Sequence, residues 1–209
     1  WFIGSKQLSD PDLVQVNLEA HAVCNEAIAA AWFWPEALEV LSSQKFVYQL
    51  AEAEAQGATQ TLSGALNAIA RATQVAAGHL SIEAIGWGTT DNPVTILPKD
   101  LWLEQALDAS PDDPPTLLWV AMTGKSTEHG CELFTSGLKL FRKPEVEVTK
   151  CTRDPDYLLE AVCDTALFLL TNSDLPEEGS QLELSNGKFR VRYGPGWRGL
   201  GRVLQLGVR

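Results

Sequence analysis

Apolar and polar positions follow two periods along this chain, one typical of strands and one typical of helices. Pro35 interrupts an alanine-rich helical pattern, because a proline inside a helix removes a donor and clashes with the preceding turn. The result is either a kink or two helices, and two are expected, with Pro35 in the first turn of the second. Thr59 or Thr61 is expected to cap a later helix, the one predicted at 62–75. Up to residue 109 the patterns predict strands at 12–18, 45–51 and 82–87, and helices at 25–41, 62–75 and 98–109.

In the remainder of the chain, a continuous apolar run at 116–122 predicts a buried strand. Asp154 and Pro155 are typical of a helix start, with an N-cap acid and a proline in the first turn. Asn186-Gly187 predicts a type I′ hairpin turn within residues 181–193. Its register would pair Leu184 with Phe189, Leu182 with Val191 and Glu183 with Arg190. Further strands are predicted at 131–135, 146–148 and 203–208.

The order of these elements predicts an α+β fold with a single mixed, largely antiparallel sheet, helices packed on it and a C-terminal β-hairpin. An apolar run such as 116–122 must be covered on both faces, which favours one continuous sheet and a single domain over residues 1–209. The three prolines within 110–115 mark the alternative, a subdivision near that segment.

Charge is distributed unevenly between the two parts of the sequence. Residues 1–120 carry 15 Asp or Glu and 4 Lys or Arg, which gives a net charge of −11, whereas residues 121–209 carry 12 of each. A field of one sign steers a partner of opposite sign and repels nucleic acid and anionic membranes. The asymmetry therefore predicts a basic protein partner, with no nucleic acid and no membrane; a surface that only maintains solubility is the simpler alternative.

Composition bears on whether the protein spans a membrane and on the compartment in which it occurs. Apolar residues make up 45% and charged residues 21%, and no stretch approaches the roughly 18 apolar residues of a membrane span. Four cysteines without a C-x-x-C pair predict free thiols and a cytoplasmic, reducing location. Because the chain begins at Trp1 rather than Met, we expect a trimmed N-terminus, and removal of a targeting segment stays open.

Three segments resemble a known family: WFWPEALEVL at 32–41, TLLWVAM at 116–122 and ELFTSGLKLFRKPEVEV at 132–148. Together they are similar to the bacterial domain of unknown function family number 4261, over nearly the whole chain. The resemblance implies an α+β domain with one sheet and, because similar proteins occur beside secreted toxins, an immunity role in a type VI secretion toxin pair. Arg142 departs from the pattern, since the family commonly has glycine there, and this affects the turn before Pro144.

Reactive residues form no arrangement that indicates catalysis. His21, His79 and His129 have no second ligand at metal-binding spacing, so no metal and no cofactor is predicted. His129 and Cys131 lack a third, orienting group. The glycine-rich loop at 194–201 lacks the Lys-Ser/Thr ending of a phosphate-binding loop.

These observations lead to a non-enzymatic prediction: an immunity protein that neutralises a basic toxin, with a nuclease as the expected class, through acidic side chains of residues 1–120. A homodimeric structural or adaptor protein, and a hydrolase whose active site is assembled from dispersed residues, are the alternatives. Trp102 and Trp197 lie in mixed surroundings and are candidate interface anchors. The predicted partner-binding residues are Glu52, Glu54, Asp91, Asp112, Asp113 and Trp102.

Overall fold

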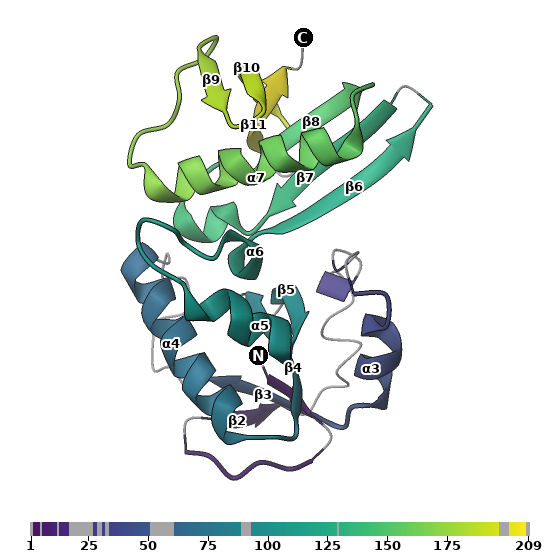
Figure 1. The fold of residues 1–209 in the computed structure, drawn as a ribbon, viewed down its shortest axis with the longest axis vertical. Coiled ribbons are helices and arrows are strands. Elements are labelled where there is room, and N and C mark those ends of the chain that lie inside the picture. Colours follow the sequence, from purple (N-terminus) through teal and green to yellow (C-terminus); the bar gives the residue numbers. More distant parts are fainter. Residues whose placement is uncertain are drawn as a thin grey trace. The chain divides into compact units, whose positions relative to one another are not determined.

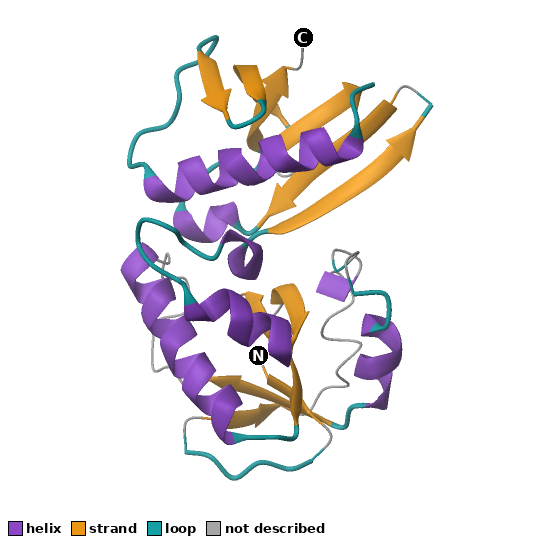
Figure 2. Ribbon diagram, in the orientation of Figure 1, coloured by secondary structure: helices purple, strands orange, loops and turns teal. Residues whose placement is uncertain are grey.

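The protein divides into two compact units, each built on its own sheet (Figure 1). They comprise Trp1–Ala121 and Met122–Arg209. The computed structural model describes residues 2–4, 6–11, 13–16, 27–28, 31, 34–50, 61–88, 93–128, 130–196 and 201–207. Helices and strands in both units confirm the α+β class (Figure 2). The predicted single sheet is wrong, since two sheets are present; the single domain over 1–209 stays a prediction.

The first unit contains a five-stranded sheet in the order β2-β3-β1-β4-β5, and its recorded pairings are antiparallel. The short strand β1 lies at the centre, and neither it nor β5 was predicted from the sequence. The strands are β1 (Phe2–Gly4), β2 (Leu13–Val16), β3 (Phe46–Leu50), β4 (Ile82–Gly88) and β5 (Pro93–Pro98). The labelled helices are α3 (Ala37–Ser43), α4 (Leu62–Gly78), α5 (Lys99–Leu107) and α6 (Thr116–Trp119).

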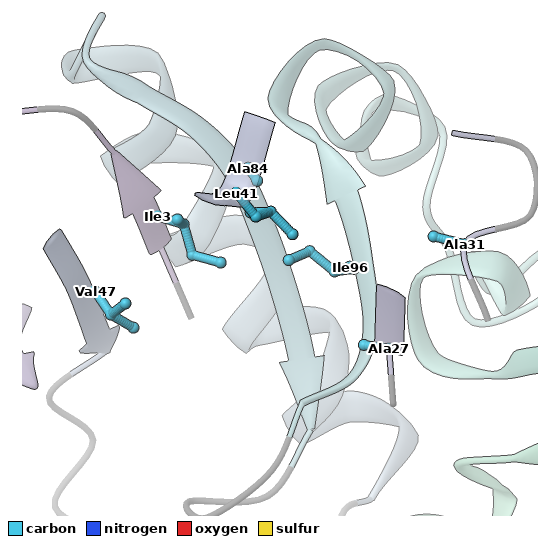
Figure 3. Packing of buried hydrophobic residues seen from close by; sticks show 7 residues of the cluster. All are labelled: Ile3, Ala27, Ala31, Leu41, Val47, Ala84 and Ile96. Carbon is cyan, nitrogen blue, oxygen red and sulfur yellow. The ribbon is translucent and has the colours of Figure 1, made fainter. Parts of the chain in front are cut away.

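The core of the first unit gathers side chains from strands and helices far apart in the sequence. Ile3 from β1, Val47 from β3 and Leu41 from α3 are each fully buried in it. Burying a side chain of this size contributes roughly 1.5–3 kcal/mol of hydrophobic stabilisation. The cluster shown in Figure 3 consists of Ile3, Ala27, Ala31, Leu41, Val47, Ala84 and Ile96.

Local signals explain how the main helix of this unit starts. The Thr61 hydroxyl accepts a hydrogen bond of 3.0 Å from the Gly64 backbone N–H, so Thr61 caps α4 as one of the two predicted candidates. A helix does follow Pro35, but α3 begins only at Ala37, so the proline lies before the N-cap Glu36 and not in the first turn, where it was expected.

The predicted strand at 116–122 is wrong over its first part. Residues Thr116–Trp119 form the helical turn α6, and a strand begins only at Ala121. Pro115 precedes the turn, where a proline favours helix entry. Leu118 and Trp119 are buried, and the Leu118 carbonyl accepts a hydrogen bond from the Thr95 hydroxyl of β5. A short apolar run does not distinguish a buried strand from a buried helix, and here packing on β4 and β5 determines the outcome.

The second unit contains a six-stranded mixed sheet in the order β6-β7-β8-β11-β10-β9. β8 and β11 are parallel, while the other recorded pairs are antiparallel. The helix α7 (Pro155–Thr171) contacts β7, β8 and β9, and the Asp154 side chain caps it by accepting from the Asp156 N–H. The remaining elements are β6 (Ala121–Thr127), β7 (Gly130–Ser136), the 3-10 turn η1 (Leu138–Phe141), β8 (Val146–Cys151), β9 (Gln181–Leu184), β10 (Gly187–Pro195) and β11 (Arg202–Gly207).

The C-terminal hairpin is present, but its predicted register and turn are wrong. Leu182 pairs with Phe189, and Glu183 pairs with Lys188, with 3.3 Å between carboxyl oxygen and ammonium nitrogen. The turn therefore consists of Ser185 and Asn186, neither of which has the positive φ that a type I′ turn requires. A shift of two residues keeps every side chain on its predicted face, so Leu182 and Phe189 remain buried.

Candidate protein-binding surface

The boundary between the two units coincides with the change in charge along the chain. Residues 1–121 contain the 15 acidic and 4 basic residues counted above, and residues 122–209 contain 12 of each. The whole net charge of −11 therefore belongs to the first unit. Self-repulsion of this kind opposes folding of the unit that carries it, so a further reason for its presence is required.

The acidic residues of the first unit are densest on α5 and in the turn after it. Asp100, Glu104 and Asp108 are exposed and four residues apart, so they lie on one face of the helix. Side chains at this spacing have Cβ atoms about 5–6 Å apart. We call these three residues the acidic stripe. Leu107, which is 81% exposed, lies beside it and adds an apolar contact.

A tight turn then presents two more carboxyl groups. Asp113 donates its backbone N–H to the Ser110 hydroxyl at 3.0 Å, and its carbonyl accepts from the Ser110 N–H at 3.2 Å. Asp112 and Asp113 are both exposed. Four residues separate Asp108 from Asp112, so their Cα atoms are at most about 14 Å apart. We call the stripe and the turn together the acidic surface: Asp100, Glu104, Asp108, Asp112 and Asp113.

No ion pair neutralises these five side chains within the part of the chain that the structure describes. Lys99 is the only basic residue between 99 and 113, and its ammonium donates to the His79 carbonyl at 3.1 Å. The carboxyl groups are thus available to an external partner. Acidic side chains elsewhere on the unit are exposed as well, with Glu36 and Glu39 at α3 and Glu83 on β4.

The arrangement on α5 is unfavourable for the helix itself. Like charges four residues apart destabilise a helix by about 0.2–0.5 kcal/mol per pair. Asp108 occupies the C-cap, and the last turn contains no basic residue. A negative charge there opposes the helix dipole, whereas Asp100 in the first turn is favoured by it. Stability of α5 therefore does not account for Glu104 and Asp108.

The structure brings together only part of the predicted site. Asp112 and Asp113 lie next to the acidic stripe, while Glu52, Glu54, Asp91 and Trp197 lie outside the described residues. Trp102 is 1% exposed on the buried face of α5, so its predicted role as an interface anchor is corrected to a core role. The sequence interpretation missed Asp100, Glu104 and Asp108. Their spacing of four within the predicted helix was the signal that could have identified them.

Other polar groups in the described chain serve the fold. The buried Glu145 carboxyl group accepts hydrogen bonds from the Thr135 hydroxyl at 2.7 Å and from the backbone N–H groups of Gly137 and Lys139 at 3.0 and 3.1 Å. These bonds fix the 3-10 turn between β7 and β8. His79 contacts the Asp10 carboxyl group at 2.8 Å and thereby joins the end of α4 to the segment before β2.

Neither a metal site nor a membrane-spanning helix is present among the described residues. No group of three His, Cys, Asp or Glu side chains there is placed to hold a metal ion. Within the same residues, no helix is long and apolar enough to cross a membrane. Comparisons with protein-family models, with curated proteins and with solved structures each gave no match. Similarity to family number 4261 therefore stays a prediction from the quoted segments.

Proposed function

We propose that this chain is an immunity protein that binds a basic toxin through the acidic surface of its first unit. The observation that carries the proposal is the concentration of unneutralised carboxyl groups on α5 and its following turn, in a unit that holds the whole net charge. Carboxyl groups accept charge-assisted hydrogen bonds from Arg and Lys side chains. A basic protein is therefore the partner that this surface fits.

A nuclease is the toxin class that the charge favours. Nucleases attract phosphate with basic surfaces, and carboxyl groups can occupy the same donors in place of phosphate. Such complexes associate rapidly when opposite charges steer the encounter, and the rate falls as salt screens the field. The toxin role itself rests on the resemblance of the quoted segments to family number 4261.

The direct test uses the product of the reading frame next to the gene for this chain. Expression of that product alone should arrest bacterial growth, and co-expression of the full chain should restore it. The purified chain should also form a complex with that product. A neighbouring product that is harmless, or that does not bind the chain, would contradict the immunity role; light scattering on the free chain tests the homodimer alternative.

Charge reversal then tests the surface. Asp112→Lys combined with Asp113→Lys should slow association with the neighbouring product roughly tenfold at low salt, and the difference should fade at high salt. Asp174→Lys combined with Glu177→Lys is the matched control, because both residues are exposed in the neutral second unit. Equal effects of the two double variants would place the interface elsewhere while leaving the immunity role intact.

A further inference from the structure

Two of the four cysteines face each other across neighbouring strands of the second unit. Cys131 at the start of β7 is the pairing partner of Cys151 at the end of β8, and both are free thiols. Directly opposed residues of an antiparallel pair point to the same face of the sheet. Twenty positions separate them in the sequence, so no local sequence signal brings them together.

A β-bulge is what aligns the two side chains. Leu133 pairs with Val148, so one residue separates the two pairs on β7 and two residues separate them on β8. The extra residue in β8 turns Cys151 to the face of Val148, whereas without it Cys151 would point to the opposite face. Bulges commonly re-aim a side chain next to a functional position.

The backbone around the pair is closely packed. Gly130 has a φ of 118°, and a Cβ atom on it would lie 2.1 Å from the Cys151 carbonyl oxygen, so only glycine fits there. Both sulfur atoms also contact Arg153. The Arg153 N–H donates to Cys151 Sγ at 3.5 Å, and Cys131 Sγ lies 3.9 Å from the Arg153 carbonyl oxygen.

From this geometry we infer that Cys131 and Cys151 form a thiol-oxidation site, which a small-molecule disulfide converts to a bond across β7 and β8. Opposed residues in an antiparallel pair have Cα atoms about 4.5 or 5.5 Å apart, depending on their hydrogen bonding. Both values lie in the range of about 4.4–6.8 Å found for disulfides. Opposed residues of a regular antiparallel pair have Cβ atoms about 4.5–5.5 Å apart, so bond formation requires them to approach by up to about 1 Å.

Exposure sets the order of the reaction. Cys131 is half-buried and Cys151 is buried, so an external disulfide reaches Cys131 first. The Cys131 thiolate attacks one sulfur of glutathione disulfide, which forms a mixed disulfide and releases one glutathione thiolate. The Cys151 thiolate then attacks Cys131 Sγ and releases the second. Two electrons pass from the protein to the glutathione disulfide, and the two thiol protons pass to the released thiolates.

The test exposes the folded wild-type chain to glutathione disulfide, then maps the alkylated peptides by mass spectrometry. The expected product links Cys131 to Cys151, with little glutathione retained. It should form at least about tenfold faster than in the urea-unfolded chain, because the native strands hold the thiols together. Equal rates in both states, or glutathione retained on Cys131 beside a free Cys151, would overturn the inference.

Variants identify the roles of the two thiols. Cys151→Ser removes the second nucleophile, so glutathione should accumulate on Cys131. Cys131→Ser should protect Cys151, because the buried thiol is not reached from outside. Cys163→Ser is the matched control and should give the linked product at the wild-type rate. The wild-type measurement needs no substitution, so it decides the inference even if a serine variant does not fold; it is also independent of the acidic surface.

Discussion

Arg142 is the one described non-glycine residue with a positive φ, at 58°. It occupies the C-cap of the 3-10 turn, and this conformation lets the Lys143 N–H reach back to the Leu138 carbonyl at 3.1 Å. A left-handed conformation brings Cβ close to the following carbonyl oxygen, which costs roughly 1–2 kcal/mol in any residue but glycine. The geometry therefore makes this a position where glycine would relieve backbone strain.

Two substitutions of Arg142 separate the energetic cost of the positive φ from the contribution of the side-chain contacts. We expect Arg142→Gly to be more stable than Arg142→Ala by about 1 kcal/mol, since both lose the guanidinium group and only alanine keeps Cβ. Urea unfolding of the two variants measures the difference directly. An alanine variant as stable as the glycine variant would show that the turn relaxes when the side chain is shortened.

The half-buried thiol of Cys163 predicts how the free energy of unfolding changes at alkaline pH. Burial, followed by the neighbouring Asp164 carboxylate, raises the pKa of the Cys163 thiol to about 11. An unfolded chain has a cysteine pKa of about 8.5, so between about pH 9 and 11 the unfolded state binds fewer protons than the folded state. The free energy of unfolding must then fall as pH rises through this window.

Cys163→Ala should remove that part of the alkaline loss. Its free energy of unfolding should fall less than that of the wild type between pH 8 and pH 11, by roughly 1 kcal/mol after allowance for screening of the half-buried thiol. The quantity compared is the change in the free energy of unfolding between pH 8 and pH 11 within each protein. The constant cost of the cavity that alanine leaves drops out of this change, and the titration of the lysines and tyrosines that both proteins share contributes equally to both. Parallel pH profiles would mean that Cys163 titrates normally.

At the scale of elements, the hairpin β9–β10 is shaped by the helix on which it docks. The Ser185 N–H donates to the Asp164 carboxyl group at 2.9 Å, and the Asn186 side-chain amide donates to the Tyr157 carbonyl at 2.7 Å. Asn186-Gly187 alone favours a type I′ turn. Hydrogen bonds to α7 outweigh this preference and move the turn to Ser185-Asn186.

Gly187 is required by the same contact with α7. A Cβ on it would lie 2.9 Å from the Tyr157 hydroxyl oxygen, and the next atom, on the Phe189 ring, is at 3.8 Å. Gly187→Ala should therefore cost about 1–2 kcal/mol of stability, because alanine is strained at this φ and the tip of the half-buried Tyr157 ring must shift. Tyr157→Phe removes the hydroxyl, so in that background the cost should fall by about 1 kcal/mol, with strain from the φ of 154° remaining. Additive effects in this double-mutant cycle would mean that the hydroxyl does not cause the clash.

Elements with strong local signals were predictable, and those determined by tertiary packing were not. The helix α7 has a cap, a proline and a long apolar face, and it begins where the sequence predicts. The strand β1 has three residues, too few to show a period, and its pairing with β3 and β4 comes from distant parts of the chain. The prediction of a single sheet was wrong for a related reason. Apolar runs show that strands are buried, but they do not show which strands pair with one another.

At the scale of the whole molecule, residue counts alone predicted the partition of charge. The boundary between the units lies within 114–124, a stretch without charged residues that separates the acidic part of the chain from the balanced part. Counts could not show which carboxyl groups are grouped on one surface, because this depends on the exposed face of α5 and on the burial of Trp102 beneath it. The grouping of these five carboxyl groups on one surface therefore depends on the fold and could not be predicted from residue counts.

Substitutions at the two ends of α5 can show whether its acidic residues serve binding or stability. Asp100→Asn removes a charge that the helix dipole favours, and Asp108→Asn removes one that it opposes. Each variant also removes one repulsive pair with Glu104, worth about 0.2–0.5 kcal/mol. In urea unfolding we therefore expect Asp108→Asn to gain at least about 0.3–1 kcal/mol and Asp100→Asn to lose a smaller amount. Both should slow association with the proposed basic partner at low salt, because each removes one negative charge from the same surface.

This combination has no explanation in stability alone. A surface that only maintained solubility would give the two opposite stability changes with no effect on association, and a surface that stabilised the fold would lose stability in both variants. If Asp108→Asn makes the protein more stable and the complex slower to form, then α5 keeps a charge that its own helix disfavours because a partner requires it.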